Sequence, residues 1–196
     1  MLMLLLLACS DEPVAEPTPV EVILPLSLSR DPVPSDAIDV AISPEGVFVD
    51  HVESDDLKVA RGKPVALRID SQVPYETLYM VVERLGNRPL TLVVQGSSGP
   101  AGIALSGPDL LVTEVSLAVL ISPEVIIART AGSPAVFEHN DHAGLRAWLA
   151  ILHQDQPGYD RATLVPHRQA TADELVAVAD AVRSAGFSRI VLGAAF

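Results

Sequence analysis

Two stretches of the chain share one pattern of apolar and polar positions. Residues 39–50 and 117–129 each contain an apolar run, a Ser-Pro-Glu turn and a second apolar run, with Ile-Ser-Pro-Glu at 42–45 and at 121–124. A turn between two short apolar runs is typical of a β-hairpin. The sequence therefore predicts two hairpins, one in each half of the chain.

A second pair of stretches follows the hairpins in the same order. Residues 67–85 and 164–182 align without a gap, and each predicts a strand followed by an amphipathic helix. Both helices place apolar residues at i, i+3, i+4 and i+7, which is one helical face. These positions are Leu78, Val81, Val82 and Leu85 in the first copy and Leu175, Val178, Ala179 and Val182 in the second. A short strand follows each helix, at 89–95 and at 189–195.

The two copies differ in the middle. Their offset grows from 79 to 97 residues, so the second copy holds 18 more residues, which include a predicted helix at 143–154. The first copy has only residues 53–63 there, enough for a turn or two of helix. Each copy thus predicts the order β-β-α-β-α-β, with the first helix shortened in copy one. We expect an α+β protein of two tandem small domains, each with helices on one face of a mixed sheet.

The N-terminal residues predict a lipoprotein leader. Residues 1–8 are apolar and precede Cys9, the only cysteine. Eight helical residues reach about 12 Å, far less than a hydrocarbon core of about 30 Å, so this segment does not predict a membrane span. Leu6-Leu7-Ala8-Cys9 resembles a bacterial lipobox, which implies lipidation of Cys9; an apolar tail with a free thiol is the alternative. Ser10 favours the outer membrane over the inner one.

Two further segments predict connections. Residues 9–36 are rich in proline and acidic residues, which favours an extended, solvated tether. Residues 96–110 begin with GSSGPAG, which predicts a linker between the two domains. The expected domains are therefore 37–95 and 111–196.

Composition narrows the choice of partner. The chain has 13 Lys and Arg against 25 Asp and Glu, a net charge of −12. Such a charge repels nucleic acid, so a nucleic-acid partner is not expected. Half of the residues are apolar (49%) but only 4% are aromatic, so we expect a core of aliphatic side chains.

The turn before the first long helix carries a family resemblance. Arg68-Ile-Asp70-Ser-Gln-Val73-Pro74-Tyr75, placed between a strand and an amphipathic helix, resembles the periplasmic domain of the ExbD/TolR family of biopolymer-transport proteins. The family pattern ends in Gly, where this chain has Glu76. In the second copy His167, Thr171 and Ala172 stand opposite Asp70, Pro74 and Tyr75.

The resemblance implies a role in protein contacts. Family members work beside an ExbB/TolQ-type partner and drive TonB- or TolA-type processes, using an N-terminal membrane helix that carries an Asp. This chain shows no such helix, so the resemblance implies only the periplasmic module, which dimerises in the family. Two fused copies suggest an internal pseudo-dimer, with a homodimer as the alternative. The candidate partner-binding residues are Asp70, Pro74, Tyr75 and Tyr79.

Several residues have two interpretations. Asp70 predicts a turn-stabilising side chain, with a catalytic acid as the alternative. Tyr75 and Tyr79 form either an exposed aromatic patch or a cover over the sheet edge. His139 and His142, in EHNDH at 138–142, could ligate a metal, but Asn140 or Asp141 there also predicts a helix N-cap. No motif for a nucleophile, a catalytic metal or a cofactor is found.

The sequence therefore predicts a non-catalytic, lipid-anchored protein at the periplasmic face of a bacterial membrane. It would be an interaction or scaffold component associated with energy-coupled biopolymer transport. A periplasmic binding module for a small ligand or for peptidoglycan is the alternative.

Overall fold

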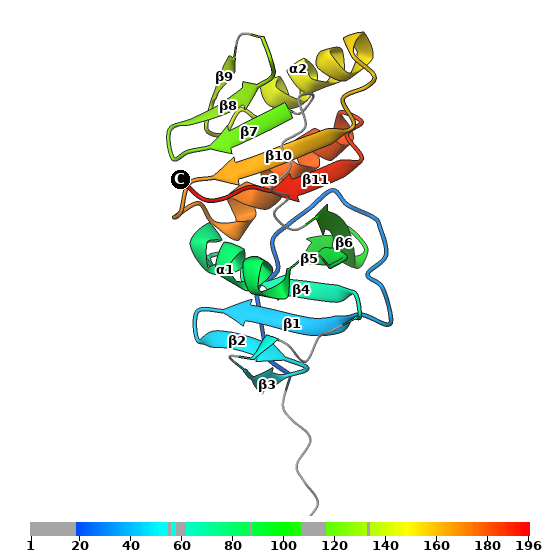
Figure 1. Cartoon of the computed structure of the whole chain (residues 1–196), viewed down its shortest axis with the longest axis vertical. Coiled ribbons are helices and arrows are strands. Elements are labelled where there is room, and N and C mark those ends of the chain that lie inside the picture. The colour runs from blue at the N-terminus through cyan, green and yellow to red at the C-terminus, as the bar shows by residue number, and fades with distance from the viewer. Residues whose placement is uncertain (1–18, 55, 58–61, 87, 107–116, 133) are drawn as a thin grey trace, which may run out of the picture.

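The computed structural model describes residues 19–54, 56–57, 62–86, 88–106, 117–132 and 134–196 (Figure 1). The leader, Cys9 and residues 10–18 of the expected tether lie outside the described residues, as do residues 55 and 58–61 of the stretch expected to hold the shortened first helix. The described part contains three helices: α1 (Tyr75–Leu85), α2 (His142–Asp155) and α3 (Ala172–Ser184). Its strands are β1 (Ile38–Ser43), β2 (Gly46–Val49), β3 (Val52–Glu53), β4 (Val65–Ile69), β5 (Leu90–Gly96), β6 (Gly99–Ser106), β7 (Leu117–Ile121), β8 (Val125–Arg129), β9 (Ala135–Glu138), β10 (Arg161–Pro166) and β11 (Arg189–Leu192).

All described strands belong to one mixed sheet. The strand order is β3-β2-β1-β4-β5-β6-β11-β10-β7-β8-β9. The α+β class is therefore confirmed. The two halves do not form separate sheets, because β6 pairs antiparallel with β5 of the first half and parallel with β11 of the second.

The two halves repeat the same strand pairing. Ile42 pairs with Val47 across the first Ser-Pro-Glu turn, and Ile121, 79 residues later, pairs with Ile126. The remaining pairs also repeat, at offsets of 79, 97 and 100 residues along the chain. The pair Val40 with Leu67 corresponds to Val119 with Leu164, and Leu67 with Leu92 corresponds to Leu164 with Leu192. Strand order and register, and not only the order of elements, are thus common to both halves.

The core is one continuous cluster of aliphatic side chains. Alternate residues of the strands join the apolar faces of the helices in it. The predicted stripes on α1 and α3 are buried, as are Leu145 and Leu149 of α2. Burial of each such side chain contributes about 1.5–3 kcal/mol. Because the cluster crosses from one half to the other, neither half has a closed core of its own.

The helix ends follow the predicted signals. Asp141 caps α2 by accepting a hydrogen bond from the backbone N–H of Gly144 (2.8 Å). Thr171 and Glu174 have the Thr-x-x-Glu spacing typical of a capping box, and they form one at the start of α3. Such caps satisfy backbone donors that a helix leaves without partners.

Three strands were not expected. Short strands β3 and β9 extend the two hairpins outward, so each half begins with three antiparallel strands. The third is β6, which occupies most of the expected linker at 96–110 and makes seven residue pairs with β5. The expectation of a linker there is wrong for residues 99–106.

The described part of the expected tether, residues 19–36, is extended but not free, and we call it the strap. Its backbone bonds to two neighbouring strands of the sheet: Gln95 N–H of β5 donates to Pro25 O (2.8 Å), and Gly102 N–H of β6 donates to Asp31 O (2.8 Å). In Figure 1 the strap is the blue segment that runs from the lower end of the molecule to the level of β6. A solvated spacer is therefore the wrong description of these residues. Within the described part of the chain, no helix is long and apolar enough to span a membrane.

We predict that Gly102→Ala destabilises both halves together. A Cβ at Gly102 would lie 2.6 Å from Thr91 Cγ2 and 3.2 Å from Pro32 O, so strand β6 or the strap must shift. The expected loss is about 1–3 kcal/mol of unfolding free energy. Denaturant curves followed by Trp148 fluorescence and by circular dichroism should move by the same amount. Gly158→Ala, where a Cβ meets nothing within 4 Å, is the control; two separated transitions would contradict a shared sheet.

Candidate functional site

The starts of α1 and α3 meet at the junction of the two halves. Pro74, the N-cap residue of α1, forms an antiparallel β-bridge with Thr171, the N-cap residue of α3. These residues are 97 apart and therefore occupy equivalent places in the two copies. Equivalent residues contact each other only at an axis of approximate two-fold symmetry. Pro74, a candidate partner-binding residue, is thus used within the chain.

Two further hydrogen bonds at this junction are related in the same way. Glu76 N–H donates to Arg168 O (3.0 Å), and Asp173 N–H donates to Ser71 O (3.2 Å). Glu76 is equivalent to Asp173, and Ser71 to Arg168, at the offset of 97 residues. Each helix therefore satisfies one of its first backbone donors with a carbonyl of the other half.

Tyr75 lies inside this junction and not on the surface. Its side chain is buried, and its hydroxyl donates to the carbonyl of Gly193 in the second half (2.6 Å). Burial, and secondarily the neighbouring Tyr79, raises the pKa of Tyr75 well above its ordinary value, so the phenol stays a donor. Tyr79 is half-buried beside it, with ring centroids 5.9 Å apart. The expectation of an exposed patch formed by both tyrosines is therefore wrong for Tyr75.

The polar residues of the Arg68–Tyr75 motif hold the strap. Asp70 accepts hydrogen bonds from Gln72 N–H (3.1 Å), which closes the turn, and from Ile23 N–H of the strap (3.0 Å). Arg68 donates to Val20 O (3.0 Å). The turn-stabilising interpretation of Asp70 is confirmed. Its second partner, Ile23, belongs to the segment that the sequence predicted to be a spacer.

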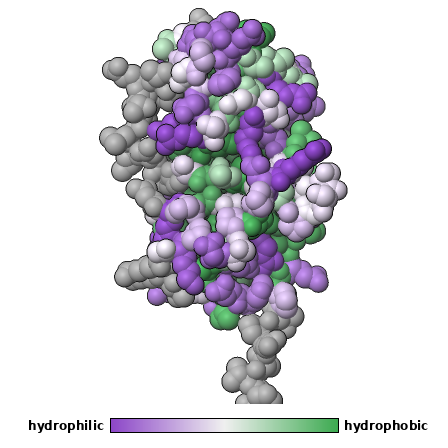
Figure 2. All heavy atoms as spheres, turned by 90° about the vertical axis from the view of Figure 1, so that its right-hand side faces the viewer, coloured by the Kyte–Doolittle hydropathy of each residue, from purple (hydrophilic) through white to green (hydrophobic). Residues whose placement is uncertain are grey.

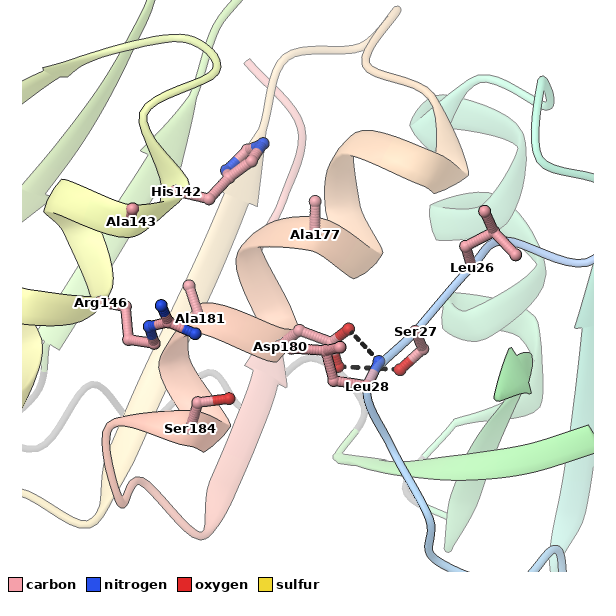
Figure 3. Close-up of a pocket in the computed structure, with 10 residues that line it drawn as sticks. All are labelled: Leu26, Ser27, Leu28, His142, Ala143, Arg146, Ala177, Asp180, Ala181 and Ser184. Atoms are coloured by element: carbon pink, nitrogen blue, oxygen red, sulfur yellow. Dashed lines mark hydrogen bonds between the residues drawn. The ribbon is translucent and has the colours of Figure 1, made fainter. Parts of the chain in front are cut away.

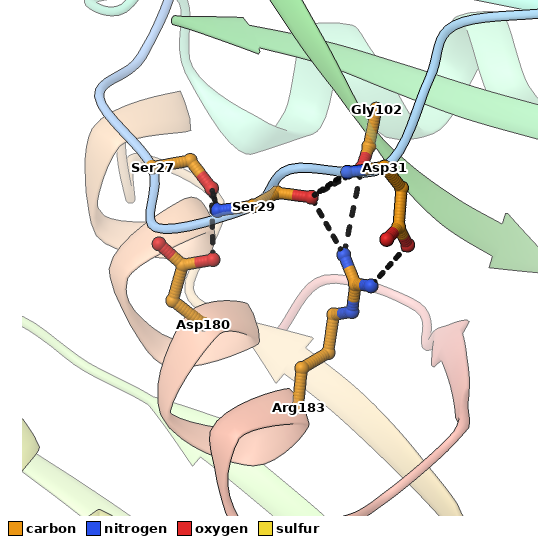
Figure 4. A network of polar contacts seen from close by, with 6 residues as sticks. All are labelled: Ser27, Ser29, Asp31, Gly102, Asp180 and Arg183. Carbon is orange, nitrogen blue, oxygen red and sulfur yellow. Dashed lines mark hydrogen bonds and ion pairs between the residues drawn. The ribbon is translucent and has the colours of Figure 1, made fainter. Parts of the chain in front are cut away.

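Further along, the strap is fixed to α3 by a buried carboxylate (Figure 4). Asp180 is 8% exposed and accepts hydrogen bonds from Ser27 Oγ (2.8 Å) and from Leu28 N–H (2.7 Å). Hydrogen bonds to a charged group contribute about 1.5–3 kcal/mol, and a buried carboxylate without partners is costly. Docking of the strap therefore supplies two hydrogen-bond donors to the buried Asp180 carboxylate of α3.

One turn later Arg183 contacts the next part of the strap. Its guanidinium donates to Ser29 Oγ (3.0 Å) and to Gly102 O (3.4 Å), and it forms an ion pair with Asp31. Ser29 in turn donates to Gly102 O (2.6 Å). The network joins the strap, helix α3 and strand β6 in one place, as Figure 4 shows.

A groove lies beside this network, between α2, α3 and the strap (Figure 3). Its volume is about 360 Å³, near the lower end of the range for small-ligand sites. Ala143, Ala177 and Ala181 provide apolar walls, and His142 and Arg146 extend from α2 toward α3. This groove thus combines apolar walls with polar groups from α2.

Of the two histidines of the EHNDH segment, His139 has structural partners on both ring nitrogens. His139 Nδ1 lies 2.7 Å from Ser122 O, and its Nε2 lies 2.9 Å from Glu174 Oε1. His142 is one residue inside α2, where burial, and secondarily His139, lowers its pKa and favours the neutral ring. Among the described residues no group of three or more His, Cys, Asp or Glu side chains is placed to hold a metal.

Comparisons with known proteins provide no relative for this chain. No family model matches it, and no curated protein and no solved structure matches it significantly.

The strap contacts are the part of the site that sequence reasoning missed. One signal was available, because Leu26-Ser27-Leu28-Ser29 alternates apolar and polar residues as a strand does. The prolines around it favoured a spacer instead. In the structure the polar residues of this alternation face the fold, and the leucines face solvent.

We predict that Asp180→Asn loosens the strap. Asparagine keeps the shape but removes the charge and replaces one acceptor oxygen with a donor. Hydrogen exchange at the amides of Leu28 and Gln95 should accelerate about tenfold, equivalent to about 1.4 kcal/mol. The control is Glu83→Gln, at the equivalent and exposed position of α1; equal effects of both changes would contradict the assigned role of Asp180.

We predict that Tyr75→Phe weakens the junction and changes its pH dependence. Loss of the hydroxyl leaves the Gly193 carbonyl without this donor and costs about 1 kcal/mol. Because the folded-state pKa of Tyr75 is raised, its contribution is fully present below about pH 10 and is lost as the pH rises above it. Urea unfolding between pH 8 and 11 should show a steep alkaline fall that Tyr75→Phe reduces. Tyr79→Phe should keep most of that fall, and the reverse order would contradict the prediction.

Proposed function

We propose that this chain is a non-catalytic interaction or scaffold protein of ExbD/TolR type at the periplasmic face of a bacterial membrane. It is held there through lipidated Cys9, at the outer membrane by preference, and is associated with energy-coupled biopolymer transport. Its partners are proteins of an ExbB/TolQ- or TonB-type system. The first support is the Arg68–Tyr75 motif, which lies between β4 and α1, the place that the resemblance implies.

The observation that carries the proposal is the repeated unit. Both halves have the same strand order and register, and equivalent residues meet at the starts of α1 and α3. A module that dimerises in the family would, when fused in tandem, pack in this way as an internal pseudo-dimer. The dimer contact is then made within one chain, which leaves the outer surfaces for other proteins.

The two ends of the sheet favour protein contacts. Strands β3 and β9 are the outermost strands, and each carries an exposed valine, Val52 and Val136. An edge strand presents unpaired backbone donors and acceptors, so a partner strand could add there. Because the ends are equivalent in the two copies, the chain would offer two similar contact sites on opposite sides.

A small-ligand or peptidoglycan-binding module remains the second candidate. The groove between α2, α3 and the strap favours it, because its volume and its converging polar groups suit a small molecule. The two functions use different surfaces, so edge-strand contacts and groove binding can be tested separately.

The test is site-specific photocrosslinking in bacterial membranes, with the photoreactive residue at Val52 or Val136. We expect adducts with ExbB/TolQ-type or TonB-type proteins from both positions, and none from the control position Gly158. Cys9→Ser should abolish fatty-acid labelling and membrane association. Adducts with peptidoglycan alone, or none at either edge strand, would overturn the proposal.

A further inference from the structure

The groove beside the strap has apolar side chains on the wall formed by α3 and on the wall formed by the strap. Ala177 and Ala181 of α3 line one wall, and Leu26 and Leu28 of the strap line another. These leucines are 76% and 69% exposed, although the serines that alternate with them, Ser27 and Ser29, are hydrogen-bonded to the fold. The face shown in Figure 2 carries hydrophobic areas between hydrophilic ones near its middle. Large exposed apolar side chains beside a cavity indicate area that an occupant would cover.

The wall of the groove formed by α2 carries a positive charge. Arg146 extends from α2 toward Ala181 (Figure 3), and no described carboxylate pairs with it. Its guanidinium is therefore available to an anionic group at the cavity. One turn earlier, the Nδ1 atom of His142 is buried and has no hydrogen-bond partner among the described residues. Two polar groups on one helix face thus lack partners at the same cavity.

We propose that this groove binds a small amphiphilic carboxylate, with its carboxylate on Arg146 and its apolar body between the strap leucines and α3. One unpaired guanidinium matches a single negative charge, whereas a phosphate dianion would need more positive charge than the groove offers. Asp180 is not a competing acceptor for Arg146, because both of its oxygens are used by the strap. This binding activity goes beyond the proposed scaffold function.

Ligand binding in the groove depends on docking of the strap. Leu26 and Leu28 line the groove in the docked strap, which is held there by Asp180 through Ser27 and the backbone of Leu28 and by backbone bonds to Gln95. A ligand that covers the leucines therefore binds the docked strap more tightly than a released one. By linkage, the ligand stabilises the docked strap by the same free energy.

The experiment is a titration of the full chain with octanoate and, separately, with a tripeptide that ends in leucine. Both offer one carboxylate and an apolar body, and the tighter ligand identifies a lipid-derived or a peptide source. We expect saturable binding by calorimetry, with at least a tenfold loss for Arg146→Gln and no change for the control Arg84→Gln on α1. Octanol, which lacks the charge, should bind at least tenfold more weakly than octanoate.

Two further variants separate recognition from folding. Ala177→Leu fills the groove without removing charge and should abolish binding, while circular dichroism stays unchanged. Asp180→Asn should weaken binding by loosening the strap. Absence of saturable binding by both ligands, or equal affinities of Arg146→Gln and the unaltered chain, would overturn the assignment. Neither result bears on the edge-strand crosslinks, which test the proposed scaffold function separately.

Discussion

Strand β6 is the constraint on which the rest of the structure depends. It pairs with β5 on one side and β11 on the other, so it turns two repeated units into one sheet. The strap is then anchored on this same strand, because Gly102 of β6 accepts from Ser29 and donates to Asp31. The junction of α1 with α3 and the groove beside α3 are both built on that connection.

The elements that the sequence predicted correctly are those whose signal lies within one short segment. The Ser-Pro-Glu turns, the apolar stripes of α1 and α3 and the caps at Asp141 and Thr171 each need fewer than twenty consecutive residues to be read. Internal repetition supported these assignments, because the same elements recur in the same order in both halves. Thus the α+β class and most of the strands follow from local periodicity together with the repeat.

The elements that were missed depend on partners far away in the chain. Ser27 meets Asp180 across 153 residues, and no local pattern marks that pairing. Strand β6 was hidden because its glycines favour a loop, whereas Gly102 is needed there for the close approach of Thr91 and the strap. For Tyr75 the sequence left an exposed patch and a cover over the sheet edge open, because its partner, the carbonyl of Gly193, lies 118 residues away.

The course of the strap determines how a mechanical pull would act on the fold. Tension applied at residue 19 would first meet the contacts of Val20 with Arg68 and of Ile23 with Asp70, and only then those of Ser27 with Asp180. These contacts would break one after another, starting from the N-terminal side. Each would release a few more residues before strand β1 felt any strain, so the folded body is shielded from forces that arrive through its own N-terminal segment.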